Sequence, residues 1–235
     1  MKFAWLLLAL LLPPALPAQN TIPAGTILPL RLETTLKTGR IKAGQAIRAE
    51  VMQDIPGTRI HRRARVLGHV VSAAPGRLEL RFDTLVANGR HIPLKTNLRA
   101  LASMTEVEIA QTPEGGPDRA TPPPFWTTEQ IGGEQVYRGG GPVARGLTLV
   151  GKPTPYGVLG QLNSSPPCRA EIAGNSAPQA LWLFSTDACG LYGFNNLKIG
   201  HAGRTEPAGS ILLLSKGSKI DLRSGSGLLL RVQGS

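Results

Sequence analysis

Glycine and proline are spread along the whole chain, and they limit the length of any helix that it can form. The 235 residues include 28 glycines and 20 prolines, which interrupt the apolar runs before a long helix is established. Between these breaks, leucine, valine and isoleucine recur at every second position, which is the spacing of a half-buried strand. We therefore expect an all-β protein.

The clearest strand patterns lie in the first half of the chain. In residues 77–83, apolar and charged residues alternate throughout, so that Leu80 and Phe82 face inward. Asn88-Gly89 follows, and this pair tolerates the positive φ angles of a tight hairpin turn. The same alternation recurs in earlier segments. Short strands joined by such turns predict an antiparallel small barrel or sandwich.

The composition changes near residue 111. Phe82 is the only aromatic residue in residues 19–110, whereas several follow from Phe125 onward. Between the two parts, residues 111–124 (QTPEGGPDRATPPP) have the proline and glycine content of a linker. We expect a signal peptide in residues 1–18, a β-module in 19–110, a linker in 111–124 and a mainly β domain in 125–235.

The start of the chain has the pattern of a secretory signal peptide. Lys2 precedes an apolar block, and prolines follow before Ala18. The block is about half the length of a membrane-spanning helix, so we expect cleavage after Ala18, with a retained anchor as the alternative. The sequence thus predicts a secreted or periplasmic protein of the cell envelope, with no transmembrane segment after cleavage.

The chain has two cysteines, Cys168 and Cys189. Export places them in an oxidising compartment, where a disulfide is the expected state. Their spacing is not Cys-x-x-Cys and no histidine is close in sequence, which argues against a redox-active or metal-binding pair. We expect one structural disulfide in the C-terminal domain.

The sequence offers no catalytic signature. Glu106 and Glu108 are two residues apart and could share a strand face, either as paired carboxylates for acid–base chemistry or, more commonly, as the charged face of an exposed strand. No histidine pair has the spacing of a zinc-binding helix. The four histidines are His61, His69, His91 and His201. We expect no metal, no cofactor and no catalytic residue, with a secreted hydrolase acting on an envelope polymer as the alternative.

Positive charge is concentrated in the expected β-module. The chain carries a formal net charge of +11, and its densest basic stretch is RIHRRAR. In the cytoplasm such a stretch would suggest nucleic acid, but the expected export argues against that partner and favours lipid head groups and acidic envelope polymers. The candidate anion- or partner-binding residues are Arg59, Arg62, Arg63 and Arg65. A basic surface that serves solubility alone is the alternative.

Residues 181–200 (LWLFSTDACGLYGFNNLKIG) interleave aromatic residues with glycine and asparagine. Rigid rings beside amides are typical of saccharide- or protein-binding faces, and equally of the core of a small β-domain. We expect Trp182 and Phe184 to lie on a strand in the core. Tyr192, Asn195 and Asn196 are candidate ligand contacts, and for Tyr192 the core is the open alternative.

Several segments of the first half occur in a familiar order. They are IPAGT (22–26), AEVMQD (49–54), RVLGHV (65–70) and LRFDTLVANGRHIPL (80–94). In this order they resemble the TrbI-like β-domain of conjugation and type IV secretion core-complex proteins, over Thr21–Ala102. The chain also resembles uncharacterised secreted bacterial proteins that begin with the same IPAGT strand. Arg62-Arg63-Ala64 stands where the family usually has proline or lysine and then glycine, so the hairpin there is expected to differ. The resemblance implies a binding or assembly role at the envelope.

Overall fold

The computed structural model describes residues 22–111, 181–200 and 209–233, together with five strands within residues 127–161. The expected signal peptide, residues 112–124 of the expected linker, Cys168 and His201 lie outside the described residues. Within the described residues, no helix has the length and apolar character needed to cross a membrane.

Strands make up most of the described chain, which confirms the mostly β character. The described residues also include one helix, α1 (Met104–Gln111). The strands are β1 (Ile27–Leu32), β2 (Leu36–Lys37), β3 (Ala46–Val51), β4 (Arg65–Ala74), β5 (Arg77–Ala87), β6 (Arg90–Pro93), β7 (Thr96–Ala102), β8 (Thr127–Ile131), β9 (Glu134–Arg138), β10 (Val143–Arg145), β11 (Thr148–Gly151), β12 (Leu159–Gln161), β13 (Phe184–Tyr192), β14 (Leu197–Ile199), β15 (Ile211–Ser215), β16 (Asp221–Leu222) and β17 (Gly227–Val232).

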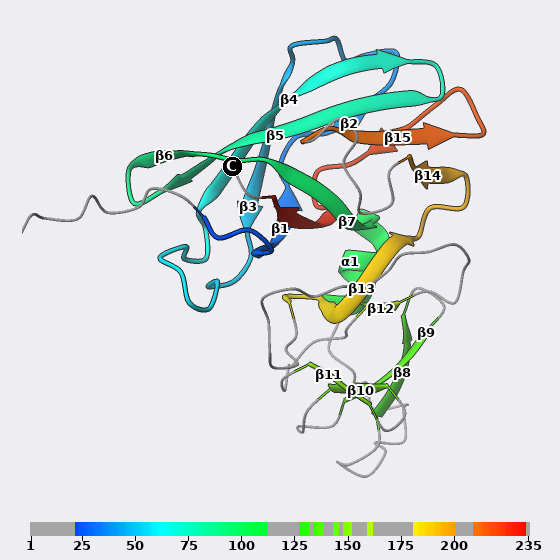
Figure 1. Cartoon of the computed structure of the whole chain (residues 1–235). Coiled ribbons are helices and arrows are strands. Elements are labelled where there is room, and N and C mark those ends of the chain that lie inside the picture. Colours follow the sequence, from blue (N-terminus) through cyan, green and yellow to red (C-terminus); the bar gives the residue numbers. More distant parts are fainter. Residues whose placement is uncertain are drawn as a thin grey trace, which may run out of the picture.

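Most of these strands belong to one curved sheet (Figure 1). Its order is β12-β13-β7-β17-β1-β3-β4-β5-β15-β14, and β6 pairs with β5. The pairs β12–β13 and β13–β7 are parallel, and the other pairs are antiparallel. Strands β8–β11 form a four-stranded sheet, and β2 and β16 form a two-stranded ribbon.

The sheet crosses the domain boundary expected near residue 110. Strand β17 lies between β1 and β7, where Leu230 is opposite both Leu28 and Leu98. Strand β15 pairs with β5, with Ile211 opposite Leu80. The expected division into residues 19–110 and 125–235 therefore does not describe this sheet. The physical reason is that β1 and β7 are buried along almost their whole length and need a neighbour on both edges.

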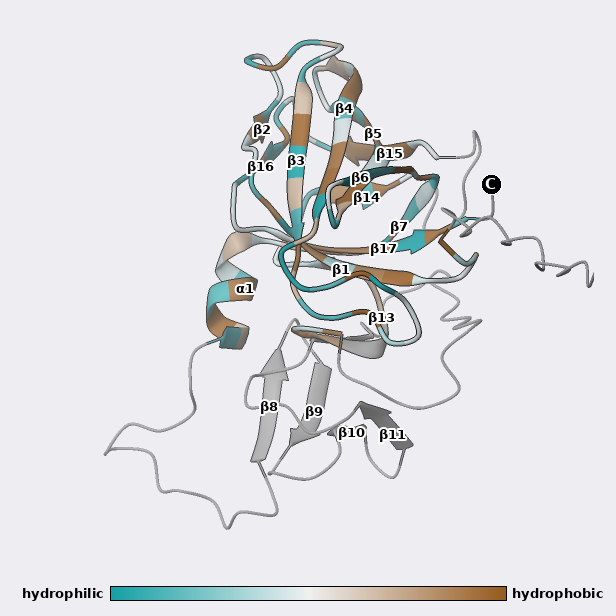
Figure 2. Ribbon diagram, turned by 90° about the vertical axis from the view of Figure 1, so that its left-hand side faces the viewer, coloured by the Kyte–Doolittle hydropathy of each residue, from teal (hydrophilic) through white to brown (hydrophobic). Residues whose placement is uncertain are grey.

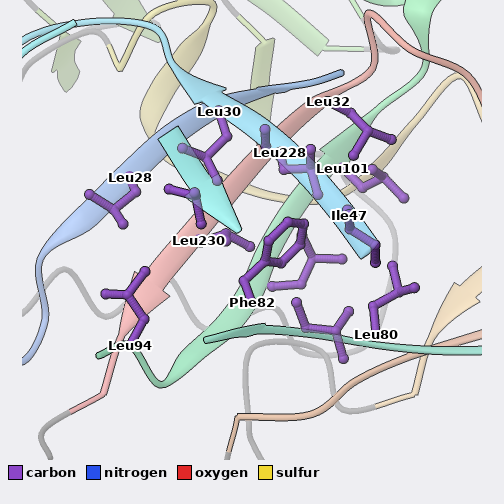
Figure 3. Close-up of a cluster of buried hydrophobic side chains, with 14 of the residues drawn as sticks. Leu28, Leu30, Leu32, Ile47, Leu80, Phe82, Leu94, Leu101, Leu228 and Leu230 are labelled. Carbon is purple, nitrogen blue, oxygen red and sulfur yellow. The ribbon is translucent and has the colours of Figure 1, made fainter. Parts of the chain in front are cut away.

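The core confirms the inward positions expected from the alternation. Phe82 and Leu80 from β5 are both buried, with Phe82 at 0% exposure. Figure 3 shows Phe82 near Leu230 from β17 and aliphatic side chains from β1, β3 and β7. Residues remote in sequence thus fill one apolar interior.

Two local features shape the β3–β6 part of the sheet. Asn88 and Gly89 have φ angles of 50° and 71°, and Ala87 pairs with Arg90 across them, which confirms the expected hairpin turn. At Gly68 the register between β4 and β5 shifts, and a Cβ atom there would lie 2.0 Å from the Arg81 carbonyl oxygen. Glycine is therefore required for this close strand approach.

The interpretation of Glu106 and Glu108 as neighbours on a strand face is wrong, because both lie in α1. Ser103 begins the helix: its Oγ accepts a hydrogen bond from the Glu106 N–H at 3.2 Å, and its carbonyl accepts one from the Val107 N–H. Val107 is buried in an apolar cluster with Phe184 and Leu229, and Figure 2 shows α1 to the left of β1 and β17. The helix ends at Gln111, so the first residue of the expected linker is helical.

Candidate functional site

The arginine-rich stretch lies in the loop of residues 52–64, which connects β3 to β4. The loop is anchored by its own backbone and by two buried side chains. The Ile55 N–H donates to the Ile60 carbonyl at 2.9 Å, and both side chains are almost fully buried. The Arg62 N–H donates to Asp54 Oδ1 at 2.8 Å. These contacts hold the loop in a defined conformation and direct its charged side chains outward.

Four arginines of this region form what we call the loop surface. They are Arg59, Arg62, Arg63 and Arg65, and all are exposed. Within the described residues, none of the four side chains takes part in an ion pair. The one acidic residue of the loop, Asp54, lies 3.6 Å from His61 Nδ1. The loop surface therefore has four arginine side chains without an ion pair in the described residues, against one aspartate, and it is net positive.

Arg63 has a φ angle of 72°, in the left-handed region that glycine prefers. Its N–H donates to the Val51 carbonyl at 2.8 Å, which fixes this conformation at the start of β4. For a residue with a side chain the left-handed conformation costs roughly 1–2 kcal/mol. The chain thus carries an arginine at a position where glycine would be more stable.

The hairpin turn between β5 and β6 lies against the same loop. Asn88 Nδ2 donates to the Arg59 carbonyl at 3.2 Å. Across the sheet, Arg65 is opposite Val86, and Val86 is opposite His91. His91 and Arg90 are both exposed, so they add basic groups beside the loop surface. Sequence analysis missed this extension, because about 30 residues separate the two segments and only strand pairing joins them.

The three histidines in the described part of the chain, His61, His69 and His91, do not form one metal-binding cluster. His69 Nδ1 lies 2.8 Å from Asp83 Oδ2 on the outer face of the β4–β5 hairpin, and both side chains are more than one third exposed. The described residues contain no group of three or more histidine, cysteine, aspartate or glutamate side chains that could hold a metal ion. His69–Asp83 is thus an isolated pair rather than part of a larger cluster.

In residues 181–200 the structure corrects the interpretation of one candidate ligand contact, Tyr192. Tyr192 is 0% exposed, and its hydroxyl accepts a hydrogen bond from the Cys189 N–H at 3.1 Å. Its ring packs edge-on against Phe184 at 6.2 Å. A ligand contact at Tyr192 is therefore wrong, because the ring fills the second apolar cluster beside β7. Trp182 is half-buried in the turn before β13 rather than on a strand.

Asn195 and Asn196 are exposed in the turn between β13 and β14. The Asn196 carbonyl accepts a hydrogen bond from the Lys216 N–H at 3.0 Å, which ties this turn to the one after β15. Their role as ligand contacts stays a prediction. Cys189 is buried, and the described residues include no free cysteine. Because Cys168 lies outside the described residues, the disulfide also stays a prediction.

A cavity of about 220 Å³ lies between the turn before β1 and the loop before β4. Pro23–Ile27, Ile55–Thr58 and Leu181 line it. None of these lining residues has a side chain that titrates. These described lining residues therefore supply no acid or base for catalysis.

Comparisons with protein families, curated proteins and solved structures gave no match. The resemblance to the TrbI-like β-domain therefore stays a prediction.

Proposed function

We propose that the protein is a secreted, non-catalytic binding or assembly protein of the cell envelope, and that it uses the loop surface to hold anionic envelope material. The observation that carries this proposal is the set of four exposed arginines without an ion pair in the described residues. A TrbI-like role in assembly is consistent with a β-module that presents charge from its loops. The proposal requires neither a cofactor nor nucleic acid.

The geometry favours contact with an extended partner over a small ligand. The loop surface is exposed, whereas the nearby cavity is lined by glycine, proline, threonine and aliphatic residues. Exposed charges attract a polyanion through long-range fields that salt screens over about 8–10 Å. Binding should therefore be spread over several cations and fall with ionic strength.

The test is charge reversal at two positions of the loop surface. The variant Arg62→Glu/Arg63→Glu should weaken co-sedimentation with envelope fragments by about tenfold or more at low salt, with a smaller effect at high salt. The matched control is Arg48→Glu/Lys198→Glu, which changes the net charge equally at exposed residues outside the loop surface. Equal binding by the two variants would show that net charge alone acts and would overturn the proposal.

Arg63→Gly separates stability from binding. The substitution relieves the left-handed strain at φ 72° and should raise the free energy of unfolding by about 1 kcal/mol, measured by urea denaturation. It also removes one cation, so binding to envelope fragments at low salt should fall. A variant that is more stable and binds with unchanged affinity would remove Arg63 from the loop surface.

The His69–Asp83 pair is the observation that favours the alternative, a secreted hydrolase. A carboxylate at Nδ1 orients a histidine so that Nε2 is directed away from it, as in a general base. Under the binding proposal His69→Ala leaves co-sedimentation unchanged, and no soluble sugars or peptides are released. Release that disappears in His69→Ala would establish the hydrolase instead, because loss of a catalytic group typically costs a factor of about a thousand or more.

A further inference from the structure

A second cationic surface lies at the end of the sheet opposite the loop surface. We call it the ribbon surface, because it surrounds the two-stranded ribbon β2–β16. It comprises Arg40, Lys42, Lys216, Lys219 and Arg223, all of them exposed. Within the described residues none of these five side chains takes part in an ion pair, and the neighbouring Asp221 already pairs with Lys37 at 3.7 Å.

The ribbon fixes the direction of these charges. The Thr38 N–H donates to the Ile220 carbonyl at 3.0 Å, and the Ile220 N–H donates back to Thr38 Oγ1 at 2.9 Å. Ile220 and Leu222 are buried, whereas Lys219 and Arg223 alternate with them and are exposed. Along this strand the charged side chains therefore lie on the outer face and the aliphatic ones enter the core.

The two surfaces are held apart by the strands between them. The turn that contains Arg40 precedes β3, and the loop of residues 52–64 follows it. Strand β4 likewise runs for ten residues, from Arg65 to Ala74. At about 3.3 Å per residue, the two ends of β4 are roughly 30 Å apart. In Figure 1, β2 lies in the upper part of the sheet, near β15, and the loop after β3 lies at its lower left.

We propose that the ribbon surface is a second binding site for an anionic polymer bearing phosphate or carboxylate groups, so that one protein molecule bridges two polymer chains. Only the loop-surface half of this inference rests on the proposed function. A rigid body with a cationic surface at each end can hold one polymer chain at each end and so link the two chains.

The described surface favours a polymer over a membrane. Binding to a bilayer surface usually combines cations with exposed apolar side chains that enter the acyl region. Among the described residues, Ile109 on α1 is the exposed large hydrophobic side chain, and it belongs to neither surface. The ribbon surface itself contains only lysine and arginine beside glycine, serine and threonine turns.

The experiment uses the mature protein and fluorescent polyphosphate that is too short to span β4. The wild type should bind about two probes per molecule, and the loop variant Arg62→Glu/Arg63→Glu and the ribbon variant Arg40→Glu/Lys219→Glu about one each. The control Arg48→Glu/Lys198→Glu should still bind about two. With long polyphosphate, the wild type and the control should raise light scattering, and each end variant should abolish the rise.

The outcomes separate the two proposals. If the loop variant binds as the wild type does while the ribbon variant loses a probe, the proposed function fails at the loop and the ribbon site stands. If the ribbon variant keeps full stoichiometry and still bridges long chains, the second site is overturned. Binding to vesicles of anionic lipid with no binding to polyphosphate would overturn the polymer as the partner.

Discussion

The strand order makes a sharp prediction about the last part of the chain. A protein that stops at residue 208 lacks β15, β16 and β17, and therefore loses the strand between β1 and β7 and one of the neighbours of β5. It also loses eight buried aliphatic side chains. These are Ile211, Leu213, Ile220, Leu222, Leu228, Leu229, Leu230 and Val232.

The loss exceeds what a domain of this size can tolerate. Each buried aliphatic side chain contributes roughly 1.5–3 kcal/mol, so the eight together contribute more than about 10 kcal/mol even after an allowance for a compact unfolded state. The total free energy of unfolding of a typical domain is only about 5–15 kcal/mol. We therefore expect the shortened chain to show no cooperative urea transition by circular dichroism.

A peptide of residues 205–235 should restore the cooperative transition in trans, which separates a missing strand from general misfolding. As a single-site version, Leu230→Ala should lower the free energy of unfolding by about 2–5 kcal/mol. Ile109→Ala is its control, because Ile109 is 48% exposed and the change there should stay within about 0.5 kcal/mol. A shortened chain that unfolds cooperatively at the wild-type urea midpoint would refute the strand order.

Three further predictions concern other parts of the fold. Gly68→Ala should cost about 2 kcal/mol or more, because its Cβ would meet a strand carbonyl oxygen at 2.0 Å, whereas Gly217→Ala has room and should be neutral by urea denaturation. The hydrogen bond from Ser210 lowers the pKa of Glu79. The Glu79 carboxylate therefore stabilises the fold above pH ~4.5, and this contribution is lost as the pH falls through the lowered pKa. Glu79→Gln should lower the free energy of unfolding by about 1 kcal/mol near neutral pH and by almost nothing in strong acid. By mass spectrometry, both cysteines should resist alkylation until reductant is added, and ready labelling of the native protein would contradict the disulfide.

The parts of the fold that could be predicted from the sequence are those set by local residue patterns. The alternation around Phe82 and the Asn88-Gly89 turn each lie within one short segment, and the structure bears out both. Strand partners are different, since nothing in the residues around Leu230 indicates that they pair with β1 and β7. The apolar run of β17 fits a buried strand in any sheet. The boundary expected near residue 110 was therefore based on the change in composition and not on strand pairing.

The same distinction applies to the candidate site. The loop surface could be found because its four arginines lie within seven residues of one another in the sequence. The ribbon surface could not, because Arg40 and Lys219 meet only through the pairing of β2 with β16. Tyr192 was ambiguous for another reason: an aromatic residue among glycines fits an exposed face and a core equally well, and only its burial decides.

The placement of charge follows from how deeply the sheet is buried. All seven residues of β7 are buried, and five of the six residues of β17 are, so these strands offer little room for solvated side chains. Arg99 is the one charged residue of β7; it is buried with the rest of the strand, and its Nε donates to the Ala188 carbonyl at 3.0 Å. A chain with a net charge of +11 must therefore carry most of its cations on turns and on the outer faces of the other strands. Turns occur at the two ends of antiparallel strands, so a basic sequence in this fold tends to become cationic at both ends.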